Sequence, residues 1–223
     1  MFHWLTRIQE STDSADEIMR YFGQMLEDGR HVFDLATGAL LGGTDVESIR
    51  EDVWGTDKRI NSNERRIRRR ILTHLTAYGA EGVGGHLAMM SIVRDAERIG
   101  DYAKNLFDLG GLGGDVPPEF HGDLLDLRNR ISRMLAKARN IYETEDEAAA
   151  RTFGQDADVV CRRCDEQIAA IISSDGPGGA AATGALAYRY LKRVTAHSAN
   201  VVTSVLVPVD QLGYWDEDDG DES

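Results

Sequence analysis

One stretch, GGLGGDVPPEF at residues 110–120, separates two runs of sequence that share the same periodicity. Its glycines and its two adjacent prolines make a continuous helix through this stretch costly. On both sides of it, apolar residues recur three or four positions apart, which is the spacing of amphipathic helices. Alternating β-branched runs bounded by tight turns, which would indicate strands, do not occur. The sequence therefore predicts an all-α chain with a linker near its middle.

Six long helices are predicted, three before the linker and three after it. We expect them at residues 14–41, 46–78, 84–109, 122–142, 146–173 and 182–206. GGTD is expected to end the first helix and to cap the second, and Thr144 to cap the fifth.

The two sets of helices align with each other. Matching Arg94 with Arg189 places Asn105 on Asn200, and matching Asp57 with Asp158 places Glu64 on Asp165. The common order of these matches predicts a tandem duplication of a three-helix bundle. The expected parts are a first repeat at 1–110, a Gly/Pro linker at 111–120, a second repeat at 121–210 and an acidic C-terminal tail at 211–223.

Charge and hydropathy limit the classes of function. The net charge of −13 opposes binding to a phosphate backbone, so nucleic acid is not an expected partner. The apolar runs are far shorter than the ~20 residues that a membrane span needs, and MFHWLTRIQE lacks the apolar core of a secretory signal. We expect a cytoplasmic protein whose membrane association is at most peripheral, through partners.

Cys161 and Cys164 are the only cysteines of the chain. A CxxC pair is compatible with a redox pair or with half of a zinc site, but no second CxxC or paired histidine completes four zinc ligands. The segment also has helical periodicity, without the βαβ context of a thioredoxin-like motif. We expect two small residues of a helix, in a reducing compartment.

Two rows of polar side chains lie beside apolar helix stripes. On a helix, residues four apart share one face, so ERIGDYAKN places Glu97, Asp101 and Asn105 in one row at the edge of an apolar stripe. In the preceding helix, Asp57 and Glu64 stand where the periodicity predicts apolar residues. Buried carboxylates need a cation or arginine partners, and oxygen-rich clusters suit hard or borderline metal ions. Acids that are solvated or paired with nearby arginines are the alternative.

RDAERIGDYAKN resembles the signature segment of the PhoU family, and DVWGTDKRINSNERRIRRRIL is similar to the second-helix pattern of that family. The resemblance implies a duplicated six-helix fold and a non-enzymatic, cytoplasmic negative regulator of phosphate uptake and phosphate signalling. It implies contacts with a phosphate ABC transporter component and a phosphate sensor kinase, and a homodimer. It also implies a bound divalent or iron-type metal, such as Fe, Zn, Mn or Mg. The implied ligands in the first repeat are Asp57, Asn61, Glu64, Glu97, Asp101 and Asn105.

The second repeat departs from the family pattern. Lys192 stands at the position of Glu97, Ala196 at that of Asp101 and Arg162 at that of Asn61. A protonated lysine and an alanine cannot ligate a metal. We therefore expect at most one metal site in the chain, in the first repeat.

An arginine run, RRIRRR, is a candidate partner-binding surface. Its members are Arg65, Arg66, Arg68, Arg69 and Arg70. Arginines bind acidic or phosphorylated groups bidentately, although in an acidic chain the same run can serve as internal counter-charge. Two other functions stay open: a metal-free helical scaffold or adaptor, and a carboxylate-bridged metalloenzyme. The metalloenzyme would need open coordination positions and a substrate pocket.

Overall fold

The computed structural model describes residues 12–80, 82–113, 116–173 and 178–213. This part of the chain consists of six long helices and one short 3₁₀ helix, with no strand in these ranges. The helices are α1 (Thr12–Leu41), α2 (Val46–Tyr78), α3 (Val83–Gly111), α4 (Pro118–Thr144), α5 (Glu147–Ile172), α6 (Gly178–Thr203) and the 3₁₀ helix η2 (Val209–Gln211). The predicted all-α class is confirmed.

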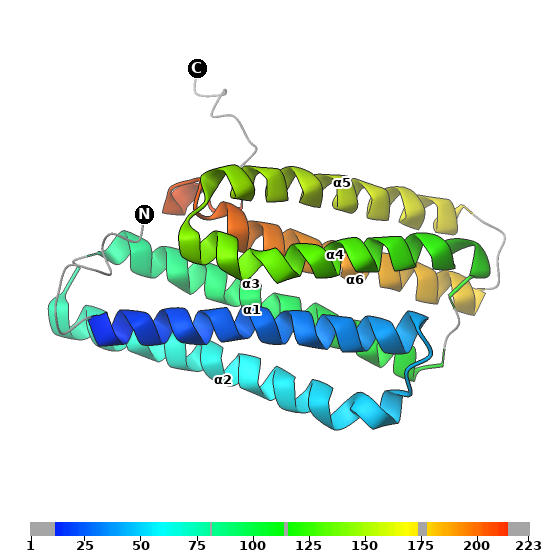
Figure 1. The fold of residues 1–223 in the computed structure, drawn as a ribbon, viewed down its shortest axis with the longest axis horizontal. Helices are drawn as coiled ribbons and strands as arrows, with labels where there is room; N and C mark the ends of the chain where they lie inside the picture. Colours follow the sequence, from blue (N-terminus) through cyan, green and yellow to red (C-terminus); the bar gives the residue numbers. More distant parts are fainter. Residues whose placement is uncertain (1–11, 81, 114–115, 174–177, 214–223) are drawn as a thin grey trace, which may run out of the picture.

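The six long helices lie roughly alongside one another, with α2 and α5 at opposite edges (Figure 1). Helix α1 packs against α2, α3 and α4, whereas α6 packs against α3, α4 and α5. The first three helices and the last three therefore meet mainly through α3 against α6 and α1 against α4.

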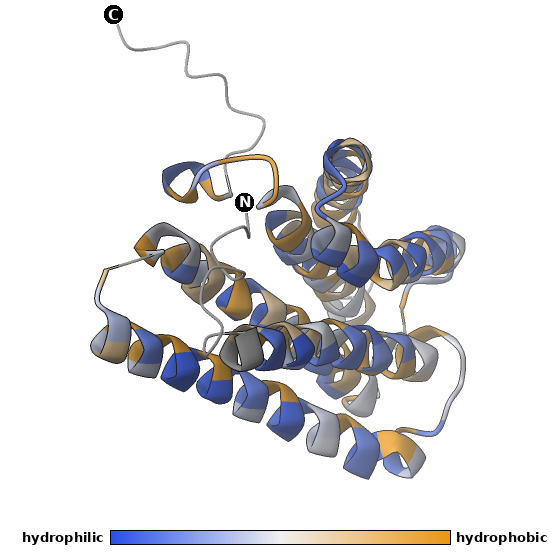
Figure 2. Ribbon diagram, turned by 60° about the vertical axis from the view of Figure 1, so that its left-hand side comes forward, coloured by the Kyte–Doolittle hydropathy of each residue, from blue (hydrophilic) through white to orange (hydrophobic). Residues whose placement is uncertain are grey.

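The apolar stripes of all six helices form one continuous core. In α3 the predicted stripe of Ile92, Ala96, Ile99, Ala103 and Leu106 is at most 2% exposed. Each helix keeps a hydrophilic outer face, which is clearest for α2 at the bottom of Figure 2. Burial of these stripes, rather than the local helix preference of the residues, supplies most of the stability of such a bundle.

The helix ends differ from the prediction at the central linker and at one cap. Gly110 and Gly111 continue α3, and a Cβ atom on Gly110 would lie 3.5 Å from the backbone of Leu40, so glycine permits the close approach of α3 to α1. Pro118 begins α4, because proline at the first helical position loses no hydrogen bond.

The cap of α5 is Asp146 rather than Thr144. Its carboxylate accepts a hydrogen bond from the backbone nitrogen of Ala149 at 3.0 Å. Thr144 is the last residue of α4 and donates to the carbonyl of Asn140. The predicted cap of α2 is confirmed, because Asp45 accepts from the backbone nitrogen of Ser48.

Helix α3 ends at Gly111 and α4 begins at Pro118, close to the proposed boundaries of the repeats. Most of the predicted acidic tail, at 214–223, lies outside the described residues, as does the segment MFHWLTRIQE. None of the helices in the described ranges has the length and apolar character needed to cross a membrane.

Candidate functional site

Helices α2 and α3 bring three of the predicted acids together in a surface that we call the α2–α3 seam, defined by Glu64, Glu97 and Asp101. Glu64 belongs to the apolar stripe of α2, whose members Ile60 and Ile67 on either side of it are almost fully buried. The side chain of Glu64 is 14% exposed and that of Glu97 is 16% exposed. Both carboxylates are thus held in a largely dehydrated groove by the packing of their apolar neighbours.

This arrangement raises the pKa of Glu97 to about 7. Burial is the largest cause, because it disfavours the charged form, and the negative charge of Asp101 comes next. Arg98 acts in the opposite direction, and Glu64 adds further repulsion. The seam therefore concentrates negative charge that a proton or another cation would relieve.

Basic side chains already approach each acid of the seam. A guanidinium nitrogen of Arg98 donates to Asp101 at 2.7 Å, and Arg98 Nε lies 3.5 Å from Glu97. Arg68 contacts Glu64 at 2.8 Å. The sequence alternative of arginine-paired acids accordingly has direct geometric support.

The other three predicted ligands lie around the seam. Asp57 is 3.5 Å from the ammonium of Lys104, and the amide of Asn61 donates to Asp57 at a long 3.4 Å. The side chain of Asn105 is half-buried.

In the part of the chain that the structure describes, no three His, Cys, Asp or Glu side chains are grouped so that they could hold a metal ion. The carboxylate oxygens of the seam have the right chemistry for a hard cation. Their present arrangement does not fit a site with three such ligands, because Arg98 and Arg68 engage them. Metal binding would require Arg98 to leave Asp101.

Gly100, in the middle of ERIGDYAKN, serves close packing. A Cβ atom at this position would lie 2.7 Å from Ile60 Cδ1. Glycine therefore lets α3 approach α2 closely beside the seam, at a cost in helix preference of ~1 kcal/mol relative to alanine.

The corresponding positions of the second half carry opposite charges. Asp165 of α5, which aligns with Glu64, lies 2.5 Å from the ammonium of Lys192 of α6, which aligns with Glu97. A repulsive carboxylate pair in the first half is thus an attractive ion pair in the second. A protonated lysine at this position cannot ligate a metal.

Much of the arginine run of α2 is engaged within the molecule. Arg68 pairs with Glu64, Arg70 forms an ion pair with Glu17 of α1, and the guanidinium of Arg66 lies 5.4 Å from the centre of the Tyr21 ring. Arg65 and Arg69 are exposed. Only part of the run is therefore presented to a partner.

Cys161 and Cys164 are both free thiols of α5. Burial raises the pKa of Cys161 to about 11 and that of Cys164 to about 12. Both remain protonated near neutral pH, when a thiol is a poor nucleophile and a poor metal ligand.

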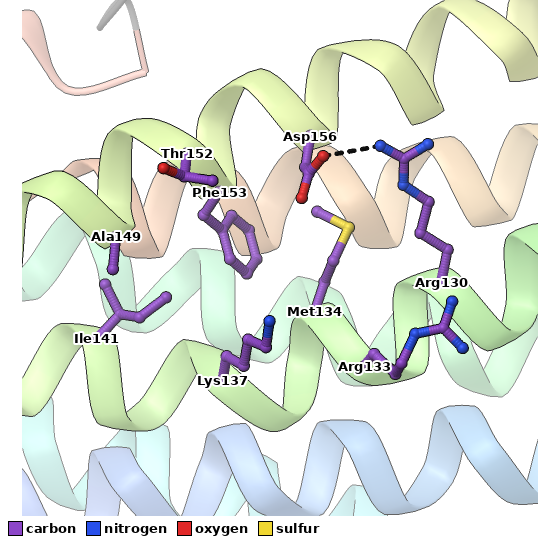
Figure 3. Close-up of a pocket in the computed structure, with 9 residues that line it drawn as sticks. All are labelled: Arg130, Arg133, Met134, Lys137, Ile141, Ala149, Thr152, Phe153 and Asp156. Atoms are coloured by element: carbon purple, nitrogen blue, oxygen red, sulfur yellow. Dashed lines mark hydrogen bonds and ion pairs between the residues drawn. The ribbon is translucent and has the colours of Figure 1, made fainter.

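A groove between α4 and α5 is a surface that sequence reasoning missed (Figure 3). Its volume is about 520 Å³, and it is lined by Arg130, Arg133 and Lys137 of α4 together with apolar residues that include Met134 and Phe153. Arg130 pairs with Asp156 of α5 at 2.8 Å. The sequence indicates that these basic side chains share one face of α4, because they are three and four residues apart. It does not show that α5 lies opposite this face.

The described fold is an all-α bundle in which α1, α2 and α3 form a three-helix unit. Residues 22–109, which contain all six predicted ligands, match the PhoU domain. The resemblance inferred from ERIGDYAKN is confirmed. A PhoU domain indicates a regulator of phosphate uptake. No curated protein matches the chain.

Proposed function

We propose that this protein is a non-enzymatic regulator of phosphate uptake and phosphate signalling that acts in the cytoplasm by protein contact. The PhoU domain at residues 22–109 is the observation that carries this proposal. The proposed partners are a component of a phosphate ABC transporter and a phosphate sensor kinase, with a second copy of the chain as a dimer partner.

Among the basic surfaces in the described ranges, two are candidates for such contacts. One consists of the exposed Arg65 and Arg69 of α2, and the other of Arg133 and Lys137 along the α4–α5 groove. We favour the groove, because a lining of basic and apolar side chains is complementary to a partner segment with acidic and apolar side chains.

Charge reversal distinguishes these surfaces. The tagged full-length chain is recovered from phosphate-replete and phosphate-starved cells, and the transporter component and the sensor kinase are quantified by mass spectrometry. We expect Arg133→Glu with Lys137→Glu to reduce recovery of a phosphate-system partner about tenfold, as loss of a complementary charge contact does. Arg65→Glu with Arg69→Glu is the matched variant for the other surface.

A phosphate-response reporter in cells that lack the protein supplies the functional test. Constitutive expression of the response, restored to normal by the wild-type chain, supports the regulatory role. Absence of both components from the recovered complexes under both conditions, with an unchanged reporter, would overturn it.

We further propose that the α2–α3 seam holds a cation through Glu64, Glu97 and Asp101, with Asp57, Asn61 and Asn105 nearby. The raised pKa of Glu97 and the lysine at the matching position of the second half support this proposal. A divalent or iron-type ion would take the place that Arg98 holds on Asp101.

Elemental analysis of the purified chain tests the cation. Asp101→Ala is expected to lower the metal content, whereas Asp165→Ala in the second half is expected to leave it unchanged. Equal metal content in wild type and Asp101→Ala would show that the seam is not the metal site. No metal in either would leave the metal-free adaptor. The pairing of Arg98 with Asp101 is the observation that favours this alternative.

A further inference from the structure

A cleft between α3 and α6 joins the two halves of the molecule. The helices pack directly against each other, and the cleft has a volume of about 610 Å³. It is lined from α3 by Ser91, Arg94, Asp95, Arg98 and Tyr102, and from α6 by Arg193 and His197. We call this the α3–α6 cleft.

The lining of the α3–α6 cleft is positively charged in a strongly acidic protein. Three arginines and one aspartate give it a formal charge of 3 − 1 = +2 with neutral histidine, whereas the whole chain has −13. The one lining carboxylate, Asp95, is already engaged by His197 Nδ1 at 2.7 Å and by the amide of Asn200 at 3.1 Å. Little of its capacity is left to neutralise the arginines.

A chain of hydrogen bonds orients Arg193. Because a carboxylate only accepts, His197 Nδ1 carries the proton that is donated to Asp95. His197 Nε2 is then free to accept from a terminal nitrogen of Arg193 at 2.9 Å. The ring of Tyr102 lies 5.2 Å from the guanidinium and stacks on His197 at 5.5 Å. Arg193 is therefore held in place before any ligand arrives.

Two of the three arginines keep hydrogen-bonding capacity. Arg193 Nε is buried and has no hydrogen-bond partner among the described atoms. Arg94 is exposed. Arg98, in contrast, is shared with Asp101 at 2.7 Å. A buried donor without a partner is costly, and an anion that drew the Arg193 guanidinium toward the cleft would supply the missing acceptor.

From this geometry we propose that the α3–α6 cleft binds a small phosphate-bearing anion. The guanidinium fork matches phosphate oxygens bidentately, and the volume lies within the ~300–1,000 Å³ typical of small-molecule sites. The ligand is either free phosphate or the phosphate group of a small metabolite. The α4–α5 groove fits a small anion less well, because several of its lining residues are apolar.

This anion site does not depend on the proposed regulatory role. Purified full-length protein is titrated calorimetrically with inorganic phosphate and, separately, with AMP, in EDTA so that no metal carries the anion. We expect saturable binding below about 10 mM of at least one of them. Tighter binding of AMP identifies a phosphorylated metabolite, and tighter binding of phosphate identifies the free ion.

Arg94→Gln and Arg193→Lys are the test variants, and Arg151→Gln, at an exposed position of α5 outside the cleft lining, is the control. Arg94 is exposed, so its substitution leaves the fold intact even if Arg193→Lys does not fold. Each test variant is expected to weaken binding about tenfold or more, as the loss of a charge-assisted hydrogen bond does, and the control is expected to leave it unchanged. No saturable binding, or equal binding by Arg94→Gln and wild type, overturns the proposal.

Discussion

Replacing Gly100 with alanine measures how tightly α3 is packed against α2 beside the acidic seam. The new methyl group would lie 2.7 Å from Ile60 Cδ1, but 3.6 Å from Cγ2 and 3.9 Å from Cγ1 of the same residue. Only the terminal methyl of Ile60 therefore stands in the way. Ile60 is 1% exposed, so this methyl cannot move into solvent.

The opposing contributions can be compared. Alanine gains ~1 kcal/mol of helix preference over glycine, whereas overpacking of a core costs roughly 1–3 kcal/mol. Gly100→Ala is thus expected to be destabilising by about 0–2 kcal/mol. Ile60→Val removes Cδ1 and alone costs about 0.5–1.5 kcal/mol. Together the two changes replace a clash by ordinary contact, so we expect a favourable coupling of at least ~1 kcal/mol.

The coupling is obtained from urea unfolding of wild type, Gly100→Ala, Ile60→Val and the double variant. The dependence of the free energy of unfolding on urea concentration should be the same for all four proteins. Gly55→Ala is the matched control, because Gly55 lies inside α2 and a Cβ atom there would meet nothing within 4 Å. It is expected to stabilise the protein by ~1 kcal/mol. The packing argument fails if Gly100→Ala stabilises as much as Gly55→Ala, or if the double variant is simply additive.

Three further predictions concern buried charge and thiols. Arg59→Met is expected to destabilise the protein more than Asp28→Asn does, by about 1 kcal/mol in urea unfolding, because it leaves the 4% exposed carboxylate of Asp28 without its two 2.7 Å hydrogen bonds. Equal losses would contradict this asymmetry. At pH 8 the thiols of Cys161 and Cys164, with their raised pKa values, are expected to react with an aromatic disulfide at least about a hundredfold more slowly than a free cysteine, and to react fast after unfolding. Fast reaction of the folded chain would instead favour a redox pair. In EDTA, the folded-state pKa of about 7 for Glu97 lies above the unfolded value, so wild type is expected to lose stability relative to Glu97→Gln as the pH rises from 5 to 8. A difference independent of pH would show that Glu97 does not titrate there.

Helical periodicity was enough to predict the fold class and most helix ends within a few residues. The apolar positions of α3 and the carboxylates of the α2 stripe follow from spacing alone, because a helix fixes which residues share a face. At the linker, the packing of Gly110 against Leu40 overrode the helix-breaking tendency of glycine.

The partners of the acids could not be predicted in the same way. Arg98 is adjacent to Glu97 in sequence but donates to Asp101, a choice that depends on long side chains in a packed groove. The contact of Asp95 with His197 joins residues about a hundred positions apart, so the α3–α6 cleft depends on how the two halves pack. Sequence spacing contains no information on that packing.

The two halves also respond differently to their surroundings. In the second half, Lys192 and Asp165 form an ion pair at the matching positions. In the first half, burial and neighbouring carboxylates raise the pKa of Glu97 to about 7, so its charge changes near neutral pH. The first half therefore contains a carboxylate whose charge changes near neutral pH, whereas the second half has an ion pair at the matching positions. Glu97→Lys would place a lysine beside Glu64, as Lys192 lies beside Asp165. It would remove from the first half the carboxylate whose charge changes near neutral pH.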